Sequence, residues 1–490
     1  MPAGFVATDF SYLLPELVLT AAALAVLLAD AFLRPARRDV LGWLSVAGLL
    51  ATALCVMVVA DVHGTAGRGL VAMDGFATFF KLVFLFAAVV TVLMSMRFLD
   101  IEGMRPGPYY FLVLCATLGM LFMASGIDLI TLFIGLETMA ISFYILTGLL
   151  KPNRRSNEAA IKYFLLGTFS LGLLLFGFSL LYGLSGSTHL RTIATVLAGR
   201  EKDAWLMLAV ILTVAGIGFK IAAVPFHMWA PDVYEGAPTP ITAFLSVGSK
   251  AASFAMLLRI FVEGLPSMNR DWQLLFYALS VVTMTVGNVA ALTQSNTKRL
   301  LAYSSIAHAG YLLIGVVAGS LRGVTAIMIY LFIYAFMQLG AFAIVVLLRR
   351  RDVIGEELKD LGGLYFRAPA AALAMLIFML SLGGIPPTAG FMAKFWLFSA
   401  AIDRGYVWLA VIGVLNSAVS LYYYLRVVVF MWMKDEAAGS EPVMSPALAV
   451  VLAVAVAGTL ALGVYPRPLF ELAAWSARSL GTVGIASMMP

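Results

Sequence analysis

Four charged side chains stand deep inside long apolar stretches of the sequence: Glu137, Lys220, Lys250 and Lys394. A charge in the middle of a membrane span costs at least about 2.5 to 3.5 kcal/mol unless it meets a partner or water. Burial disfavours the charged ammonium, and a neighbouring carboxylate favours it again. A lysine held between these influences can bind and release a proton near neutral pH. The pattern therefore predicts proton transfer, with Lys220 as a switchable carrier.

The competing interpretation of these charges is structural. Glu137 can form an ion pair with one of the lysines and simply fix the packing of two helices. One carboxylate cannot neutralise three lysines, however, so the residue types favour a hydrated chain of titrating groups. Pro225, shortly after Lys220, supports this view, because a broken helix admits water and exposes backbone dipoles.

Each of three further titratable residues has two possible interpretations. Lys162 lies a short way into its apolar stretch, so it can extend to the membrane surface or join the chain. His308, in AYSSIAHAGYLL, either titrates near neutrality or remains a neutral ring held by nearby serines. His227 follows the proline and serves either in a proton relay or in a structural hydrogen bond. The basic residues nearest to span ends are expected to reach the surface: Lys81, Arg259 and Arg426.

The composition identifies a membrane protein. Of 490 residues, 62% are hydrophobic and only 12% are charged, whereas a soluble domain carries about 25% charged residues. The two cysteines, Cys55 and Cys115, lie far apart and the four histidines are scattered, so no disulfide framework, iron–sulfur cluster, haem or zinc motif is indicated. No GxxxxGK[ST] sequence is present, which excludes ATP hydrolysis through a P-loop.

The apolar stretches predict an all-α polytopic membrane protein, because lipid offers no partner for unpaired backbone groups. The amino-terminal segment MPAGFVATDF lacks the basic region of a cleaved signal peptide, so the first stretch is expected to be retained. At about 20 residues a span, about fourteen transmembrane helices are expected, over residues 12–33, 40–60, 76–98, 109–124, 127–150, 157–183, 204–229, 240–262, 272–293, 299–319, 323–348, 368–402, 406–432 and 444–465.

Two of the predicted spans are interrupted near their middle. The seventh contains Val224-Pro225 and the twelfth contains the sequence GGIPP at 383–387, and proline breaks or kinks a helix. The breaks lie five helices apart, an odd number, which predicts two inverted five-helix repeats, each with a broken helix at a transport site. The predicted divisions are 1–105 (three helices), 106–265 (helices 4–8, first repeat), 266–435 (helices 9–13, second repeat) and 436–490 (helix 14 and tail).

Basic residues are more numerous in the loops after odd-numbered spans than on the opposite side. The positive-inside rule then places both termini on the outer, periplasmic side and the WAPDVYEGAPTP loop on the inner side. Frequent Ala and Arg residues favour a bacterial inner (plasma) membrane. Before the seventh span, STHLRTIATVLAGREKD has apolar residues at helical spacing, which predicts either an amphipathic surface helix or an ordinary loop.

Four stretches resemble the antiporter-like membrane subunits of respiratory complex I, the proton-translocating NADH:quinone oxidoreductase. They are LFIGLETMAISFYIL, GFKIAAVPFHMWAPDVYEGAPTPITAFLSVGSKAASF, NTKRLLAYSSIAHAGYLL and GGIPPTAGFMAKFWLF. The wording DVYEGAPTP is similar to the subunit N branch, whereas sister subunits and multisubunit cation/proton antiporters more often read DAH before APTP. The resemblance covers residues 10–465.

The resemblance implies roles for the matching charged residues. Glu137 matches the glutamate of the fifth helix that pairs with the lysine of the seventh helix, Lys220. Lys250 matches the central lysine of the eighth helix. Lys394 matches the lysine of the twelfth helix, where one sister subunit has glutamate.

The resemblance also favours a functional role for Lys162 and His227, for which the residues alone left two interpretations open. Lys162 matches a lysine of the sixth helix, and His227 matches the histidine of the PFH motif. His308 lies in the tenth-helix block of the family.

The resemblance further implies a subunit that moves protons outward along Lys220, Lys250 and Lys394, with Glu137 modulating Lys220 when a change arrives from a neighbouring subunit. The expected partners are protons, the lipid bilayer and other membrane subunits, especially sister antiporter-like subunits, and not nucleic acid. No cofactor is expected in this chain, which alone catalyses no redox reaction. NADH, FMN, iron–sulfur clusters and quinone are expected in partner subunits.

Two alternatives remain at this point. The chain can belong to a cation/proton antiporter that uses an ion gradient, in which case protons would move in a sodium-dependent way without NADH. It can also be a structural membrane subunit whose buried charges only fix helix packing, in which case neutralising Glu137 would harm assembly and leave turnover intact.

Overall fold

The structure, a computed structural model, describes residues 7–34, 38–60, 63–350, 355–434, 442 and 444–480. Within these residues, 12 helices are long and apolar enough to cross a membrane. The predicted multi-pass helical architecture is therefore present. This number is smaller than the predicted one because the seventh and twelfth predicted spans are each divided into two shorter helices. The boundary predicted at 435–436 lies outside the described residues.

Several helices begin where a polar side chain accepts a hydrogen bond from the first turn, as Asp203, Asn296 and Ser320 do. The elements are α1 (Ala7–Tyr12), α2 (Leu14–Phe32), α3 (Val40–Val58), β1 (Gly64–Ala66), β2 (Val71–Met73), α4 (Gly75–Glu102), α5 (Pro106–Ser125), α6 (Leu129–Thr147), α7 (Arg154–Ser185), α8 (Leu190–Ala198), α9 (Ala204–Lys220), α10 (Trp229–Gly236), α11 (Thr239–Phe244), the π-helix η2 (Leu245–Ser249), α12 (Lys250–Leu258), the π-helix η3 (Arg259–Gly264), the 3-10 helix η4 (Pro266–Met268), α13 (Asn269–Ala291), α14 (Thr297–Ala318), α15 (Leu321–Leu348), the 3-10 helix η5 (Leu358–Leu361), α16 (Leu364–Arg367), α17 (Pro369–Gly383), α18 (Ala389–Asp403), α19 (Val407–Met433), α20 (Pro446–Val464) and α21 (Arg467–Arg478).

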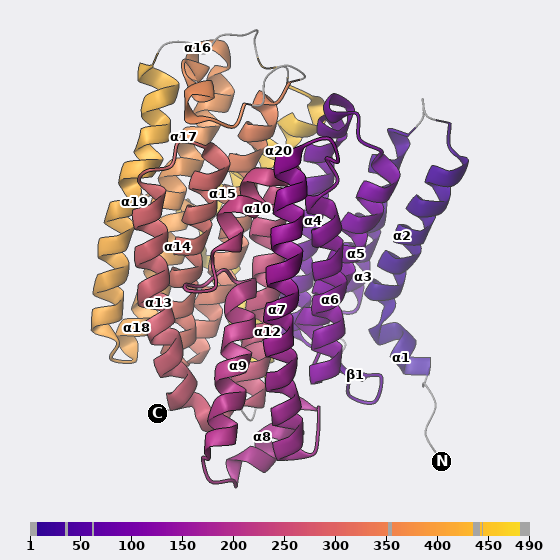
Figure 1. The fold of residues 1–490 in the computed structure, drawn as a ribbon, viewed down its shortest axis with the longest axis vertical. Coiled ribbons are helices and arrows are strands. Elements are labelled where there is room, and N and C mark those ends of the chain that lie inside the picture. The colour runs from indigo at the N-terminus through magenta and orange to yellow at the C-terminus, as the bar shows by residue number, and fades with distance from the viewer. Residues whose placement is uncertain are drawn as a thin grey trace.

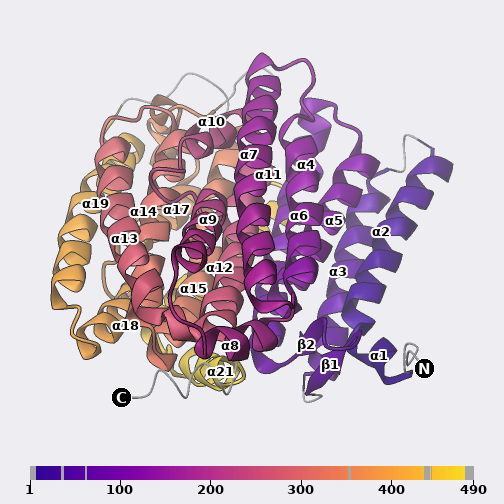
Figure 2. The same cartoon turned by 60° about the horizontal axis from the view of Figure 1, so that its bottom comes forward.

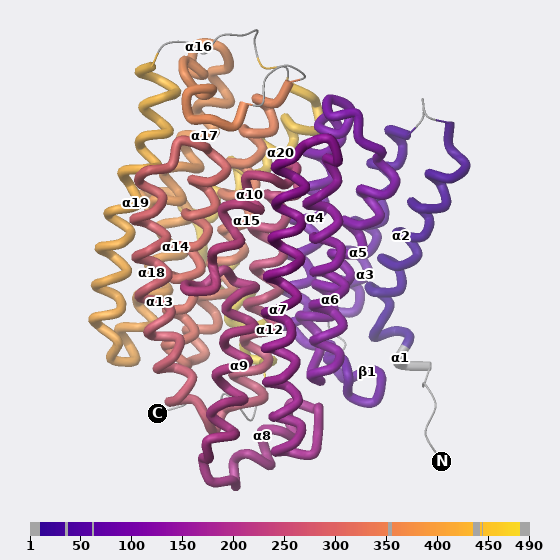
Figure 3. Tube along the Cα trace, viewed as in Figure 1, coloured from indigo at the N-terminus to yellow at the C-terminus, as the bar shows by residue number. Residues whose placement is uncertain are grey.

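The helices stand side by side, from α2 and α3 at one flank to α19 at the other (Figure 1). The tube view shows the same progression along the chain (Figure 3). Between the flanks, three spans are almost entirely buried inside the protein: Thr239–Gly264, Thr297–Ala318 and Leu321–Leu348. Polar side chains on these central helices are therefore shielded from lipid by the surrounding helices.

Both predicted interruptions are present. A turn segment that contains Pro225 separates α9 from α10. A second segment separates α17 from α18, and there Gly384 adopts φ of 84°, a left-handed conformation that glycine takes without a Cβ clash. Because each helix stops inside the bundle, the carbonyl groups in the last turns of α9 and α17 have no partner further along their own helix.

The buried span Thr239–Gly264 contains two π-helical stretches that the sequence did not predict. η2 ends directly before Lys250, and η3 begins at Arg259. The wider π-turn changes the direction of the side chains that follow it, and π-turns inside helices are frequent at functional sites. Both basic residues of this span, Lys250 and Arg259, thus stand where its regular α-helical geometry changes.

One end of the bundle carries α1, the β1–β2 hairpin, α8 and α21 (Figure 2). The hairpin was not predicted. The segment before the seventh span does form a helix, α8, which buries Leu190, Ile193 and Leu197 against the bundle and leaves Val196 exposed. The start of α4 is joined to Ser479, directly after α21, by a 2.8 Å hydrogen bond from Phe76 N to Ser479 Oγ. The first and last described helices therefore lie at the same end.

Lys81 and Arg259 do not extend to the membrane surface, which corrects the prediction from their positions near span ends. Lys81 is 0% exposed, and its Nζ lies 2.6 Å from Glu16 Oε1. Arg259 is also 0% exposed and pairs with Asp74 at 2.8 Å and with Glu263 at 3.1 Å. Glu16 and Asp74 are distant in sequence from the cations they neutralise, so local spacing gave no sign of these pairs.

Arg426 is half-buried and also turns into the protein. Its guanidinium donates a 2.7 Å hydrogen bond to the carbonyl of Leu292 and another to that of Gln294. Basic side chains stabilise helix ends in this way. Arg426 therefore caps the carboxyl end of α13 from the neighbouring helix α19, rather than extending to the surface.

We expect Glu16→Gln to destabilise the folded protein by about 3 to 5 kcal/mol, because it leaves the buried Lys81 ammonium without its counter-ion. The double variant Glu16→Gln/Lys81→Met should recover much of this loss. Thermal unfolding of the detergent-solubilised protein measures both effects. The single variant Lys81→Met completes the comparison. If the loss of stability in the double variant equals the sum of the losses in the two single variants, the proposed ion pair is contradicted.

Candidate functional site

The buried cations fall into two groups. In the first, Lys81, Arg259 and Lys298 each have a carboxylate oxygen within 3.1 Å. In the second, no carboxylate oxygen of the described residues lies within 4.0 Å of the ammonium nitrogen, although each side chain is buried. The second group comprises Lys220, Lys250 and Lys394, three of the residues predicted from the sequence.

Lys220 is the last residue of α9, directly before the first break. Its Nζ donates a 3.4 Å hydrogen bond to Tyr144 Oη on α6. The same nitrogen lies 5.6 Å from the ring centroid of Tyr144 and 5.9 Å from that of Phe219. Ring faces and the negative end of a helix dipole both attract a cation. Lys220 is therefore stabilised by dipoles and rings rather than by a direct counter-ion.

Glu137 acts on Lys220 through space. The two charges interact electrostatically, but they form no direct ion pair. Glu137 Oε1 is buried and has no hydrogen-bond partner in the protein. Tyr144, which binds Lys220, lies two helical turns from Glu137 on α6 and so shares its face. One face of α6 thus presents both a carboxylate and a hydroxyl towards the lysine.

Lys250 is held by α14. Its Nζ donates to the backbone carbonyl and to the hydroxyl of Ser305. Ser305 Oγ lies 3.2 Å from Tyr234 Oη of α10, within hydrogen-bond distance. The ring centroid of Tyr334, on α15, lies 5.7 Å from the ammonium. Lys250 is therefore surrounded by neutral groups from three other helices.

His308 lies one turn along α14 from Ser305 and is held by tyrosines. Its Nδ1 is hydrogen-bonded to Tyr330 Oη, and its Nε2 lies 3.0 Å from Tyr424 Oη. The adjacent serines, which the sequence suggested as partners, bind other groups instead. Ser304 is bonded to Tyr424 at 2.5 Å, and Ser305 is bonded to the lysine described above.

Lys394 reaches back across the second break. Its Nζ donates to the carbonyls of Leu382 and Gly383, each at 3.0 Å, and to Ser417 Oγ at 2.7 Å. These carbonyls belong to the last turn of α17, whose negative dipole end favours a cation. The ring centroid of Tyr311 lies 5.0 Å from the ammonium. The broken helix thus supplies the acceptors that solvate the charge.

A continuous series of contacts joins Lys250 to Lys394 through His308. Tyr334 contacts Lys250, and its ring centroid lies 5.1 Å from that of His308. On the other side, the ring of Tyr311 lies 5.8 Å from His308 and contacts Lys394. The imidazole also interacts electrostatically with both lysines. His308 therefore stands between the two ammonium groups, among tyrosine hydroxyls.

The contacts between Lys220 and Lys250 also run through aromatic rings. Phe219, next to Lys220, stacks on Trp229 with ring centroids 5.3 Å apart. The ring of Trp229 lies 6.5 Å from that of Tyr234, whose hydroxyl meets the serine that holds Lys250. The rings of Phe219 and Trp229 and the hydroxyl of Tyr234 therefore bridge this interval.

Lys162 lies outside this series. It is half exposed, and its Nζ lies 2.7 Å from both Glu158 and Asp232. Asp232 of α10 also pairs with Arg299 of α14 at 2.8 Å. Lys162 therefore belongs to an ion-pair cluster that joins α7, α10 and α14, and not to the group of buried lysines.

His227 lies between α9 and α10 and is half-buried. Its Nδ1 is buried without a hydrogen-bond partner, and its carbonyl accepts a 2.9 Å hydrogen bond from Ala230 N. Within the described residues, no hydrogen bond joins its ring to the three buried lysines. The adjacent Pro225 and Phe226 line an apolar cavity of about 360 Å³ between α9 and α13.

Sequence reasoning missed the tyrosines that surround these charges. Tyr144, Tyr311, Tyr334 and Tyr424 each contact one of the lysines or His308, and all four are buried. A signal was present, because Tyr330 and Tyr334 are four residues apart and so lie on one face of their helix. Their role depends on contacts between distant helices, which spacing within one helix does not reveal.

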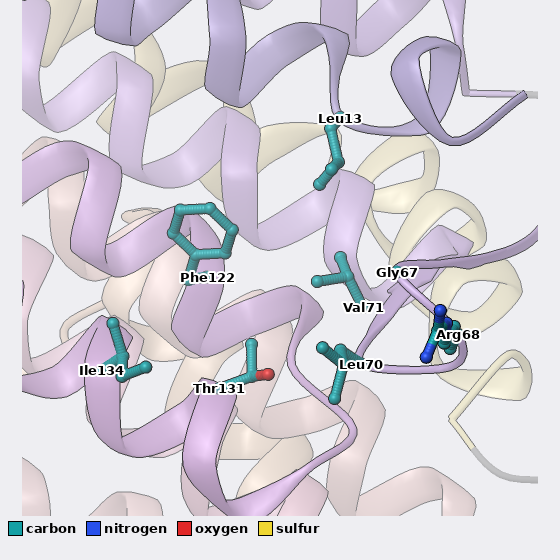
Figure 4. Close-up of a pocket in the computed structure, with 8 residues that line it drawn as sticks. All are labelled: Leu13, Gly67, Arg68, Leu70, Val71, Phe122, Thr131 and Ile134. Carbon is teal, nitrogen blue, oxygen red and sulfur yellow. The ribbon is translucent and has the colours of Figure 1, made fainter. Parts of the chain in front are cut away.

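Two cavities differ in their relation to the site. One, of about 510 Å³ between α18 and α19, is lined by Lys394 and Ser417 together with phenylalanines. Another, of about 470 Å³ near the β1–β2 hairpin, is lined largely by apolar side chains such as Leu13, Phe122 and Ile134 (Figure 4). The second cavity contains none of the predicted site residues. In the described part of the chain, no cluster of His, Cys, Asp or Glu is suited to holding a metal ion.

Comparison with known proteins identifies the family. Residues 126–420 match the family described as NADH:quinone oxidoreductase/Mrp antiporter, TM. The chain is 47% identical over 463 residues to NADH-quinone oxidoreductase subunit N 2 of Rhizobium meliloti (strain 1021), covering 94% of this chain and 96% of that protein. It is 51% identical over 408 residues to NADH-quinone oxidoreductase subunit N 2 of Solibacter usitatus (strain Ellin6076), covering 83% of each.

A solved structure agrees with these relatives. Respiratory complex I from Thermus thermophilus with bound aureothin contains a chain that superposes with a TM-score of 0.80 at 34% identity, covering 94% of this chain and 99% of that chain. The matched family region includes both broken helices and Glu137, Lys220, Lys250 and Lys394. The resemblance seen in the sequence is thereby confirmed, and the chain belongs to the antiporter-like membrane subunits, in the subunit N branch of NADH-quinone oxidoreductase.

Proposed function

We propose that this subunit moves protons across the membrane through Lys220, Lys250 and Lys394, and that electron transfer in partner subunits drives the movement. The observation that carries the proposal is the lack of a carboxylate beside these three buried ammonium groups within the described structure. A lysine that only fixed helix packing would be expected to have a direct counter-ion, as Lys81 has in Glu16.

The partners of the three lysines suit both protonation states. A hydroxyl group can accept a hydrogen bond from a charged ammonium and can donate one to a neutral amine. A carboxylate can only accept, so it would hold the proton on the lysine. Each of the three lysines has one hydroxyl partner. These partners are Tyr144 for Lys220, Ser305 for Lys250 and Ser417 for Lys394.

Glu137 is the modulator in this proposal. Its carboxylate favours the charged form of Lys220 from a distance, without the direct contact that would lock the two groups together. A movement of α6, or a charge change arriving from a neighbouring membrane subunit, would alter this influence. The proton affinity of Lys220 would then change during the working cycle of the complex.

His308 is proposed as the relay between Lys250 and Lys394. A neutral imidazole has one nitrogen that donates and one that accepts, and both ring nitrogens here meet tyrosine hydroxyls. Proton exchange between the two nitrogens therefore needs only rotation of hydroxyl groups and a change of tautomer. Lys162 and His227, which lie outside the buried series, are proposed to exchange protons with water nearer the inner surface.

The arrangement in the membrane follows as part of the same proposal. If α9 with α10, and α17 with α18, each form one broken span, two crossings are added to the 12 long helices. This arrangement is the one expected for inverted repeats over 106–265 and 266–435. An even number of crossings fits the position of α1 and α21 at one end of the bundle. We assign this end to the periplasmic side of a bacterial inner membrane, from the distribution of basic residues.

We expect Lys220→Ala to leave the complex assembled and to lower coupled turnover and proton translocation at least about tenfold, because positioned proton-transfer groups contribute roughly 10²- to 10⁴-fold. Native membrane vesicles allow NADH-driven quinone reduction and proton translocation to be recorded together, with assembly checked on a native gel. The control is Lys202→Ala, which removes an exposed lysine paired with Asp271 and should change little.

Unchanged NADH oxidation and translocation in a fully assembled Lys220→Ala complex would refute this role. Sodium-dependent proton movement without NADH would instead identify a subunit of a cation/proton antiporter, which the family description also includes.

We expect Glu137→Gln to preserve assembly and to slow coupled turnover by roughly 5- to 150-fold, the range of typical coupling energies. The reason is that glutamine keeps the shape of the side chain and removes only its charge, while no direct ion pair is broken. The same vesicle measurements apply. Loss of assembly with full turnover in the complex that does form would support a structural subunit instead.

A further inference from the structure

Gln338 of α15 is a buried polar residue that the proposed proton path does not use. Its side chain is 0% exposed, and neither its amide nitrogen nor its amide oxygen has a hydrogen-bond partner in the protein. All the residues that follow Gln338 up to the end of α15 at Leu348 are apolar or glycine. Burying an unpaired amide is costly. The site therefore suits a small ligand that both donates and accepts hydrogen bonds.

The position of Gln338 on its helix places it on the face that carries Tyr334, whose ring contacts Lys250. Tyr334 lies one turn earlier on α15, and residues four apart share a helix face. That face is turned towards Lys250, because the ammonium lies 5.7 Å from the ring centroid of Tyr334. In addition, α15 packs against α11 and η2, the two segments that lead directly to Lys250.

A row of buried hydroxyl groups runs along these two segments. Thr239, Thr242 and Ser246 follow one another at helical spacing, and all three are buried. Thr242 and Ser246 donate to backbone carbonyls, which leaves their lone pairs able to accept hydrogen bonds. At the far end of the row, Thr239 lines a polar cavity of about 250 Å³ with charged residues such as Lys298 and Glu356.

We propose that the side chain of Gln338 binds internal water beside Lys250 and positions this water to exchange a proton with the lysine. The inference rests on the proposed function and deepens it, because it assigns a positioning residue that carries no charge of its own. An amide can donate to water and accept from it without ionising. It can therefore hold water in either orientation without competing for the proton, as a carboxylate in the same position would.

The alternative is that the amide is buried dry and serves no function. The two views predict different effects on turnover for Gln338→Met, which keeps the length of the side chain and removes its hydrogen bonding. If the amide is dry, removing an unpaired polar group should stabilise the protein and leave turnover unchanged. If it positions water, stability should stay equal or rise while proton transfer slows.

The test compares Gln338→Met, Gln338→Asn and the control Ile344→Leu, a volume-conserving change at another buried position of α15. Each variant is made in the complete complex in native membranes. Assembly, the thermal unfolding midpoint, NADH-driven quinone reduction and proton translocation are measured. We expect Gln338→Met to assemble with an equal or higher midpoint and to lower turnover and translocation at least about fivefold. Gln338→Asn, which retains an amide, should recover most of the loss.

Full turnover and translocation in Gln338→Met would overturn the inference. If that variant does not assemble, a high-resolution structure of the unaltered complex decides the question. Water density at about 2.7 to 3.2 Å from the Gln338 amide would support the inference. An amide bonded only to protein groups, or to nothing, would overturn it.

Lys250→Ala, measured in the same membranes, separates this inference from the proposed function. Unchanged turnover in Lys250→Ala would refute proton transfer through Lys250, whatever Gln338→Met does. Loss of turnover in Lys250→Ala with full turnover in Gln338→Met would refute the inference alone.

Discussion

The cost of keeping an ammonium group away from water governs the central part of this structure. The chain meets this cost in two ways. Lys81 and Arg259 meet carboxylates directly, which fixes the helices that carry them. Lys220, Lys250 and Lys394 are held by hydroxyls, carbonyls and ring faces. These neutral groups stabilise an ammonium less than a carboxylate does, so the lysine can release its proton more readily. In the proposed function, the difference between an anionic and a neutral partner therefore separates the cations that hold the fold from those that carry protons.

Interrupted helical geometry supplies some of these neutral partners, and facing helices supply the others. Two backbone carbonyls at the end of α17 accept hydrogen bonds from Lys394. Lys220 lies at the carboxyl end of α9, the negative end of the helix dipole. Lys250 has no break beside it, but η2 ends directly before it, and a facing serine supplies both a carbonyl and a hydroxyl. Three different local solutions thus provide the same kind of uncharged acceptor.

Sequence reasoning reached the features whose cause is local. A proline within an apolar stretch, or a lysine far from its ends, is visible without knowing any contact, and both breaks and the burial of the three lysines followed from such signals. Partners contributed by distant segments were not reachable, which is why Lys81 was expected at the surface although Glu16 neutralises it. Gln338 escaped notice for another reason. An uncharged amide among apolar residues gives a weak signal, and its lack of partners exists only in the packed bundle.

The proposed path has two intervals, and the contacts in both run through aromatic rings. Between Lys250 and Lys394, His308 is hydrogen-bonded to Tyr330 and Tyr424. In the described structure no hydrogen bond continues from these tyrosines to either lysine, so proton transfer through this interval needs water or side-chain movement. Between Lys220 and Lys250, the ring of Trp229 intervenes, so transfer there needs water or movement of α10. Because α10 also carries Asp232, which pairs with cations of α7 and α14, its position depends on both neighbours. In the proposed function, a rearrangement arriving from an adjacent subunit would therefore act on the interval between Lys220 and Lys250 through the position of α10.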